Sequence, residues 1–358
     1  MSVHETELGK QAGSSVAQLS MAVIGTGHLG SIHARILGQH GGARLRALVD
    51  RDQERAGALA AELAAGAEPP VVFACVEDLL EAMGEELDGV VVAVPTVFHA
   101  QVAVPLLEAR IPVLVEKPLA NSLEEADRIL AAAQASGTIL TVGHVERFQP
   151  GLRRVLEQGW QPRFIECHRL APPSFRSMDV GVVHDLMIHD LDLILSMVKS
   201  PVAELDACGG AILGEREDLA SVRLIFENGA RASVTASRAS LQPMRRFRMF
   251  SSRGYVSLDF NRNYGISVAK GPEWDARRAE LAELAPEELM ARKDELAGAV
   301  LAVEEMALEG EQRPLQAELD AFLGAVRGGG EVEVTGADGR AALELAERIV
   351  GAIREVAW

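Results

Sequence analysis

The sequence predicts an α/β protein: a doubly wound parallel sheet followed by a second domain built on a largely antiparallel sheet. Over the first third, short β-branched runs alternate with Ala/Leu/Glu-rich stretches, which is typical of a doubly wound sheet. After about His144 the strand-like runs follow one another with turn signals between them, which predicts hairpins. At roughly 150 residues per domain, a chain of 358 residues also predicts about two domains.

The strands expected in the first domain are nearly continuous apolar runs, as in parallel strands covered on both faces. They lie at 21–25, 45–50, 89–95, 111–117 and 138–142, with 71–73 as a weaker candidate. Helical composition fills 52–65, 99–110 and 122–136. Ser122 and Glu125 form a capping box that predicts the start of the last helix. We therefore place a first domain at 21–143, behind a polar tail at 1–20.

The second domain is expected at 144–358. Its predicted strands lie at 164–170, 202–213, 220–226, 230–237, 246–250 and 255–259. Asn228-Gly229 separates two of them and is a strong signal for a hairpin turn. Helices are expected near 183–197, 315–326 and 338–354, while the composition of 274–311 fits either helix or strand. Consecutive hairpins with a helix on one face indicate a largely antiparallel sheet.

Charge and cysteine content exclude several classes of protein. The formal net charge of -17 repels phosphate backbones, so we expect neither nucleic acid nor an anionic membrane as a partner. Cys75, Cys167 and Cys208 are scattered, which argues against a disulfide framework or zinc ribbon and fits a reducing compartment. We expect no metal site. Because the amino terminus lacks the apolar core of a signal peptide, a cytoplasmic location is predicted.

A glycine motif follows the first predicted strand: Gly25-Thr26-Gly27-His28-Leu29-Gly30. Between a strand and a helix, its first glycine makes a tight turn and its second lets the backbone approach a pyrophosphate. The third lets helix and strand pack closely. The pyrophosphate then rests on N–H groups at the start of the helix. Alone the motif is weak, since a structural turn has the same pattern, but its position here predicts a dinucleotide site.

Asp50 and Arg51 end the second predicted strand, at the distance from the glycine motif where a ribose-binding acid is expected. A carboxylate there accepts bonds from a ribose 2′-hydroxyl and repels a 2′-phosphate, which favours NAD. Arg51 leaves NADP open as an alternative. A solvated aspartate at a strand end is the structural alternative for Asp50.

Two further clusters carry candidate chemistry. Glu116-Lys117-Pro118 ends a predicted strand at the edge of the sheet where ligands bind. On a helix, Asp185, His189 and Asp192 share one face, and a carboxylate bonded to an imidazole raises the basicity of its other nitrogen. The structural alternatives are a lysine at a solvent rim and a surface pair.

Four segments together resemble the Gfo/Idh/MocA oxidoreductases: GTGHLGSIHA, AVPTVFH at 93–99, EKPLA at 116–120 and D-x-x-x-H at 185–189. The resemblance implies a Rossmann domain, then an α/β domain with an open, mostly antiparallel sheet. It also implies a nicotinamide cofactor and a sugar or cyclitol substrate. Carried onto matching positions, Lys117 lies at the reacting carbon, and Asp185 and His189 complete a triad with His189 as acid/base. Candidate cofactor contacts in these segments are Gly25, Gly27, His28, Leu29, Gly30, Asp50, Arg51, Thr96, His99, Glu116 and Lys117.

His99 has an alternative, since packing in the core or a loop is equally compatible with its position. Within the family, GHVERFQP at 143–150 and FRSMDVGVVHDLMIHDLDL at 175–193 are most similar to UDP-N-acetylglucosamine 3-dehydrogenases. That similarity implies a 3-keto nucleotide sugar as product, which serves diamino-sugar synthesis for lipid A. A diphosphate needs cations that bind it in a planar, bidentate way. The candidates are Arg147, Arg169, Arg176, Arg246 and Arg248.

We therefore expect NAD-dependent oxidation of a sugar hydroxyl, at C3 of UDP-GlcNAc. The alternatives are a dehydrogenase of another sugar or cyclitol, such as a UDP-uronic acid or myo-inositol, and a non-catalytic NAD sensor. The expected partner is the nucleotide-sugar substrate. An open sheet face needs cover, which predicts a homodimer or homotetramer.

Overall fold

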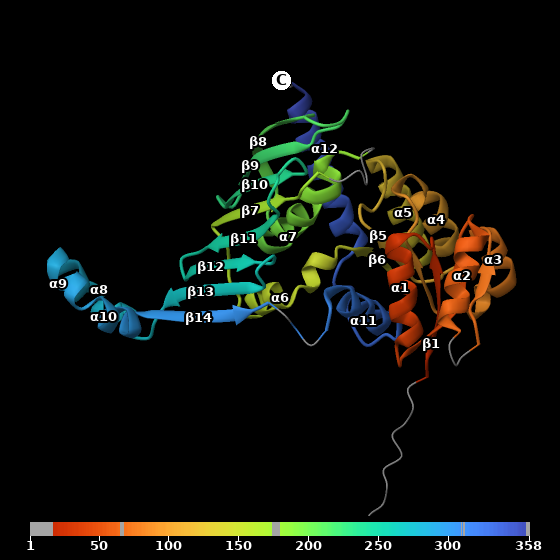
Figure 1. Ribbon diagram of the computed structural model, residues 1–358, viewed down its shortest axis with the longest axis horizontal. Helices are drawn as coiled ribbons and strands as arrows, with labels where there is room; N and C mark the ends of the chain where they lie inside the picture. The colour runs from red at the N-terminus through yellow and green to blue at the C-terminus, as the bar shows by residue number, and fades with distance from the viewer. Residues whose placement is uncertain (1–16, 65–67, 174–179, 309, 311, 356–358) are drawn as a thin grey trace, which may run out of the picture.

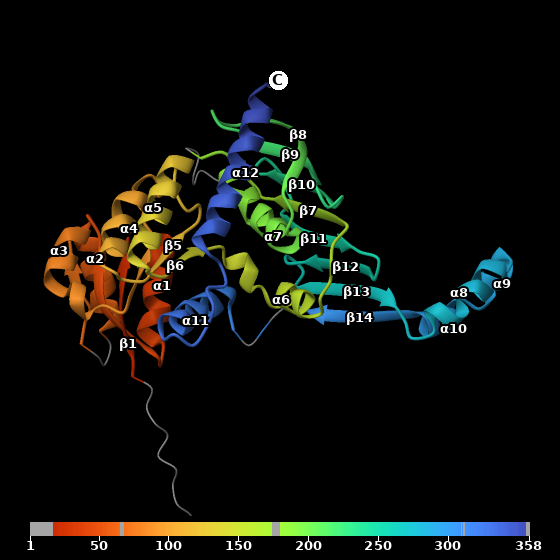
Figure 2. The same cartoon turned by 180° about the vertical axis from the view of Figure 1, so that it is seen from behind.

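The protein is described here by a computed structural model covering residues 17–64, 68–173, 180–308, 310 and 312–355. It contains two sheets, each with its own helices, joined near residue 144 (Figures 1 and 2). The α/β class, with a parallel sheet first and a mostly antiparallel sheet second, is confirmed. Among these residues no helix is both long enough and apolar enough to cross a bilayer.

The first sheet has six parallel strands in the order β3-β2-β1-β4-β5-β6. They are β1 (Leu19–Ile24), β2 (Ala43–Val49), β3 (Val71–Phe73), β4 (Gly89–Val92), β5 (Val113–Glu116) and β6 (Leu140–Gly143). Every run predicted in this domain forms a strand, and β1 begins two residues inside the stretch expected to be a tail. The strand order reverses between β1 and β4, and ligands bind at such a switch point in doubly wound sheets.

Helices cover both faces of this sheet, so successive residues of β1 enter different cores. Ala22 and Ile24 pack with α3 (Val76–Met83), α4 (His99–Glu108) and α5 (Leu123–Ser136). Met21 and Val23 pack with α1 (His28–Gln39), α2 (Gln53–Leu63) and the distant α11 (Pro314–Val326). The predicted helix start is confirmed, because the Ser122 hydroxyl accepts the Glu125 N–H at 3.2 Å; this is half of the predicted capping box, and Glu125 Oε2 has no hydrogen-bond partner among the described residues.

The second sheet has eight strands in the order β14-β13-β12-β11-β7-β10-β9-β8. They are β7 (Phe164–Leu170), β8 (Val202–Gly210), β9 (Leu219–Phe226), β10 (Arg231–Ser237), β11 (Met244–Phe250), β12 (Gly254–Asp259), β13 (Tyr264–Lys270) and β14 (Leu301–Ala307). Among the strand pairings of the described residues in this sheet, only that of β7 with β10 is parallel. The predicted hairpin joins β9 to β10, with Gly229 at φ +80°.

One face of this sheet packs on α6 (Pro150–Glu157), α7 (Ile188–Val198) and α12 (Gly336–Glu355). The opposite face is partly open, and Phe164, Tyr264 and Val303 on it are 38%, 42% and 57% exposed. The ambiguous stretch after β13 contains both kinds of structure: α8 (Trp274–Glu283), α9 (Pro286–Ala291) and α10 (Lys293–Val300), then β14. These three helices project beyond the sheet as an arm (Figure 1).

The last two helices tie the two halves together. α12 contacts α7 and β8 of the second half as well as α5 and β6 of the first. α11 buries Leu319, Phe322 and Leu323 in the core beneath the first sheet. The amino-terminal sheet is therefore completed by residues far along the chain.

Candidate active site

The glycine loop between β1 and α1 has the geometry that a dinucleotide site needs. Gly25 has φ +91°, and a Cβ on it would meet the Ala93 carbonyl oxygen at 2.5 Å. A Cβ on Gly30 would lie 1.7 Å from the carbonyl oxygen of Gly25. Gly27 differs, because a Cβ there would have no atom within 4 Å. The outer glycines thus serve the turn and the packing, while the middle one leaves space at the start of α1, where His28 and Leu29 are exposed.

Asp50 follows β2 directly and ties that strand end to the glycine loop. Its carboxylate accepts the N–H and the hydroxyl of Thr26, both at 2.7 Å, and pairs with Arg55 at 2.8 Å. Partial burial raises the pKa of Asp50, but hydrogen bonds from Arg55, the Asp52 N–H and Thr26 outweigh it and lower the pKa to about 2. The group is a permanent anion, suited to accept a hydroxyl and to repel a phosphate.

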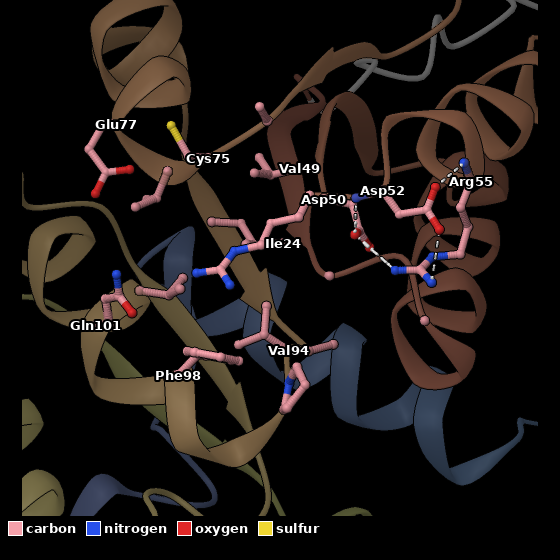
Figure 3. Close-up of a pocket in the computed structure, with 18 residues that line it drawn as sticks. Ile24, Val49, Asp50, Asp52, Arg55, Cys75, Glu77, Val94, Phe98 and Gln101 are labelled. Carbon is pink, nitrogen blue, oxygen red and sulfur yellow. Dashed lines mark hydrogen bonds and ion pairs between the residues drawn. The ribbon is translucent and has the colours of Figure 1, made fainter.

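A pocket of about 490 Å³ opens beside Asp50 at this edge of the sheet. In Figure 3, Asp50, Asp52 and Arg55 lie at one end and Cys75, Glu77 and Gln101 at the other. Ile24, Val49 and Val94 supply apolar wall, and the guanidinium of Arg51 lies 4.8 Å above the Phe98 ring. Apolar walls with one fixed carboxylate fit an adenosine whose ribose faces Asp50.

Arg55, Phe98 and Gln101 also line this pocket, and none of them was predicted from the sequence. Asp52 caps α2 through the Arg55 N–H, which places Arg55 in the first turn beside Asp50. That cap was the available signal for Arg55. Phe98 and Gln101 lie inside or just after the family-like segment at 93–99.

The two remaining residues predicted in that segment lie elsewhere. Thr96 lines a smaller hollow with Pro118, Asn121 and His184, between the two halves of the chain. His99 is 1% exposed, with Nδ1 3.0 Å from the Pro118 carbonyl oxygen and Nε2 3.0 Å from that of Val94. Both contacts involve backbone, so His99 holds the segment after Lys117 to the segment after β4. Burial lowers the pKa of His99, so the ring is neutral and only one nitrogen donates at a time.

Lys117, directly after β5, reaches across to the second half of the chain. Its Nζ donates to the backbone carbonyl of Asp185 at 2.7 Å and lies 3.5 Å from the Asp185 carboxylate. Asp185 belongs to a single π-helical turn, Val183–Met187, that runs into α7. Such wide turns occur often at functional sites, because they redirect side chains at a helix end. The predicted neighbours Lys117 and Asp185 are thus brought together.

His189 stands one turn further along, at the start of α7. Burial lowers its pKa well below the ordinary value, and the positive charges of Lys117, Arg169 and Arg245 act in the same direction. The imidazole is therefore neutral at neutral pH and can accept a proton. Its Nδ1 is buried with no hydrogen-bond partner in the described part of the chain. The charge of Lys117 acts on this imidazole, so both groups share one neighbourhood.

Asp192, the third residue predicted to share a helix face with Asp185 and His189, has a different partner. Asp192 is 1% exposed and forms a two-bonded pair with Arg147, at 2.6 and 2.7 Å. Nearby, His144 is fully buried, and neither of its ring nitrogens has a partner among the described residues. Burial is also the main reason that the pKa of His144 is lowered. The surroundings of Lys117 therefore hold two uncharged imidazoles.

Glu116 lies behind Lys117 and is buried. One carboxylate oxygen accepts His33 Nε2–H at 2.7 Å, and the other accepts the Lys117 N–H at 3.2 Å. Burial raises the pKa of Glu116, but His33 and Lys117 together outweigh that effect and lower it. Glu116 therefore holds the backbone N–H of Lys117 from the buried side of the site.

The arginines predicted to bind a diphosphate all have partners where they are described. Arg169 is 9% exposed and holds Asp190 with two bonds of 2.8 Å, and it also contacts Glu146. Arg147 is occupied by Asp192. On the open face of the sheet, Arg246 pairs with Asp259 at 3.0 Å and Arg248 with Glu166 at 2.6 Å. Arg176 lies outside the described residues.

Comparisons with known proteins agree with this geometry. Residues 19–144 match the oxidoreductase family with an NAD-binding Rossmann fold, and residues 157–257 match the GFO/IDH/MocA C-terminal domain. The chain is 35% identical over 278 residues to UDP-N-acetylglucosamine 3-dehydrogenase of Acidithiobacillus ferrooxidans, covering 76% of this chain and 85% of that protein. It is 34% identical over 200 residues to inositol 2-dehydrogenase of Corynebacterium glutamicum, covering 52% and 56%.

Solved structures agree over nearly the whole chain. A structure of the Acidithiobacillus ferrooxidans enzyme superposes with a TM-score of 0.80 at 31% identity, covering 94% of this chain and 98% of that one. GenD2 from gentamicin A biosynthesis, solved with NAD, has a TM-score of 0.75 at 22% identity, which shows a shared fold. The chain belongs to the Gfo/Idh/MocA family of oxidoreductases, acts on CH-OH groups and uses NAD bound to its Rossmann domain.

Proposed function

We propose that the protein oxidises the C3 hydroxyl of UDP-GlcNAc to the ketone, with NAD as the acceptor. The observation that carries the proposal is the meeting of Lys117, Asp185 and His189 at the joint between the two halves, 2.7 Å separating Lys117 Nζ from the Asp185 carbonyl oxygen. The identity of the substrate rests on the 35% identity to a UDP-N-acetylglucosamine 3-dehydrogenase.

In this proposal His189 is the general base. A neutral, partly buried imidazole takes the hydroxyl proton of the sugar, and Lys117 donates a hydrogen bond to the same oxygen as negative charge develops on it. Asp185 holds the ammonium of Lys117 in place through its carbonyl and carboxylate. NAD, when bound, accepts the hydride that leaves the sugar carbon. Each protein group thus acts on the oxygen or its proton.

The state of the arginines decides which of them suit a diphosphate. Removing a partner from a buried pair costs about 3–5 kcal/mol, so Arg147 and Arg169 are poorly placed to change partners. Exposed pairs are worth about 0–1 kcal/mol. Arg246 and Arg248, whose side chains are each 37% exposed, lie on the open face of the sheet, opposite the face that packs on α7, so they are not placed to hold the diphosphate of a sugar at His189. Arg176 remains a prediction from sequence.

NADH formation tests the proposed substrate. The purified protein is incubated with NAD and, separately, UDP-GlcNAc, a UDP-uronic acid and myo-inositol, and NADH absorbance is followed. We expect the highest kcat/KM with UDP-GlcNAc. A higher kcat/KM with the uronic acid or with inositol contradicts UDP-GlcNAc as the substrate, while the protein is still a dehydrogenase. Tight NAD binding without turnover of any sugar favours the sensor, which would need no acid/base group.

The open face of the second sheet supports a further part of the proposal, self-association. Phe164, Phe250 and Tyr255 form an aromatic cluster on that face, with ring centroids 5.8 and 4.8 Å apart. Arg248 and Glu166 beside them offer both signs of charge to a symmetry-related copy. We expect light scattering to show a dimer or tetramer for the wild type. Phe164→Lys should reduce the fraction of that oligomer. A monomeric wild type contradicts this.

A further inference from the structure

Glu318 on α11 is a buried carboxyl group that the mechanism above does not use. It is 3% exposed, and neither carboxyl oxygen has a hydrogen-bond partner among the described residues. It comes from the far end of the sequence, yet its oxygens lie within 4.8 Å of ligand atoms on His33 and Glu116. A charged carboxylate without donors is among the costliest groups to bury, so this placement requires an explanation.

One explanation is a metal ion held by His33, Glu116 and Glu318, and the geometry argues against it. His33 Nε2 and Glu116 Oε1 are 2.7 Å apart, a direct hydrogen bond. Two ligands about 2.1 Å from one ion in the tetrahedral arrangement of zinc stand about 3.4 Å apart. The His33–Glu116 contact is shorter and is that of a direct hydrogen bond, so a proton is the simpler charge to place between the two carboxyl groups.

The surrounding charges support an un-ionised Glu318. Burial, together with the Glu116 charge, raises the pKa of Glu318 well above its usual range. Glu116 already has His33 and the Lys117 N–H as donors, so it is the member of the pair that stays ionised. Two carboxyl groups this close cannot both be charged at low cost.

No other cation is free to neutralise Glu318 among the described residues on the neighbouring elements. On the turn after β6, which packs against α11, Glu146 is held by Arg169 and Arg245, and Arg147 by Asp192 and Asp338. His144 before that turn is neutral at neutral pH, its pKa being lowered by burial. From α1 His33 uses Nε2 for Glu116, while its buried Nδ1 has no hydrogen-bond partner among the described residues. Glu333, which lines the same small cavity as Glu318, pairs with Arg153.

We propose that Glu318 is a positioning residue: it stays protonated, shares that proton with Glu116, and so fixes the Glu116 carboxylate that holds the backbone of Lys117. The chain of contacts runs from α11 through Glu116 to the Lys117 N–H, and from Lys117 Nζ to Asp185. Glu318 never touches substrate. The consequence for turnover rests on the proposed function of Lys117, whereas the protonated state does not.

Stability against pH tests the protonated state without any activity measurement. Between the ordinary carboxyl pKa and the raised one, folded Glu318 binds a proton that the unfolded chain has lost, so wild-type stability falls as pH rises. Glu318→Gln keeps the shape and cannot ionise. We expect the ratio of unfolding constants, wild type over Glu318→Gln, to grow by up to about tenfold per pH unit above pH 4.5.

The matched control is Glu108→Gln, an exposed glutamate on α4, which should show a constant ratio. Infrared difference spectra of the two proteins at neutral pH should contain the carbonyl band of a protonated carboxyl that Glu318→Gln lacks. A constant ratio for Glu318→Gln, or no such band, overturns the protonated state. So does a bound divalent metal in the purified protein that disappears in Glu318→Gln.

Kinetics test the positioning role separately. Glu318→Ala should lower kcat by about 10²-fold, the cost of a misplacement on the order of 1 Å, while KM for NAD changes little. Glu318→Gln should restore kcat because its amide still donates to Glu116. An unchanged kcat in Glu318→Ala overturns the positioning role. If the wild type turns over no sugar, the proposed function fails while the stability and infrared results still decide the protonation of Glu318.

Discussion

His189 is a partly buried imidazole with three positively charged groups acting on it, and this environment sets its protonation. Burial together with Lys117, Arg169 and Arg245 lowers its pKa, so the ring carries no charge at neutral pH. A base must be uncharged before it receives a proton. In the proposed mechanism, the same cations that suppress protonation of His189 also stabilise negative charge on the substrate oxygen. One local charge distribution therefore serves both steps.

Replacing His189 by Ala should lower kcat by about 10²–10⁴-fold, the usual contribution of a general base. NAD affinity should change little, since Asp50 and the glycine loop bind the other end of the cofactor. Steady-state kinetics and NAD titration by fluorescence measure the two effects. His40→Ala, at the far end of α1 and paired with Asp320, is the control that should keep full turnover. Unchanged kcat in His189→Ala removes the residue from this role.

The lowered pKa of His189 also shapes the pH profile. Protonation of the base stops the reaction, so kcat/KM should fall only below pH 6.5, the ordinary imidazole value, and stay level through neutrality. Lys117→Met removes one of the cations that lower this pKa, so the acid limb of its remaining activity should move to higher pH. Profiles of both proteins check this. An unmoved limb means that the titrating group is not His189.

At the scale of elements, the loop between β1 and α1 separates two functions of glycine. Gly27→Ala adds a methyl group where no protein atom lies within 4 Å, so the fold should keep its melting temperature. The methyl enters the space expected for the pyrophosphate, so the Kd for NAD should rise at least tenfold. Gly30→Ala places a methyl 1.7 Å from a backbone oxygen and should destabilise the protein itself. Calorimetry with and without NAD distinguishes the expected loss of NAD binding in Gly27→Ala from the expected loss of stability in Gly30→Ala.

Elements with local signals were predictable from the sequence. The cap at Ser122, the turn at Asn228-Gly229 and the glycine loop each depend on residues within a few positions of one another. Strand β13 was missed, because its pattern is decided by pairing with β12 and β14. Helix α3 was missed as well, since its eight residues are too few for a periodic signal.

The candidate site was predictable only where motifs carried it. Lys117 came from one segment and Asp185 with His189 from another, and the structure brings the two segments into one neighbourhood. The partners of Arg147 and Arg169 were not predictable, because Asp192 and Asp190 on α7 meet them only after α7 packs against more distant segments of the second half. Glu318 had no signal either, since a glutamate in an amphipathic helix normally faces solvent.

For the whole molecule, three histidines that are neutral in the folded protein predict a loss of stability in acid. Burial lowers the pKa of His99, His144 and His189, so below pH 6.5 the unfolded chain binds protons that the folded chain does not. Each contributes a slope of up to about 1.4 kcal/mol per pH unit, and stability falls as pH falls. Glu318, with a raised pKa, contributes one slope of the opposite sign.

The net expectation is a free energy of unfolding that decreases from pH 6.5 to pH 5. Urea unfolding at fixed ionic strength measures it. Replacing His144 by Phe, which fills similar space and cannot titrate, should make the decrease shallower. An increase in stability over this range contradicts the assignment of neutral histidines.

Helix α11 has a consequence for how the molecule is made. Its apolar side chains close the core below a sheet whose last strand ends at Gly143, roughly 180 residues earlier. At about 5–20 residues per second, a ribosome needs roughly 10–40 s to synthesise that interval. During this time the nascent cofactor domain keeps an apolar surface exposed, so we expect chaperones to bind it until α11 emerges.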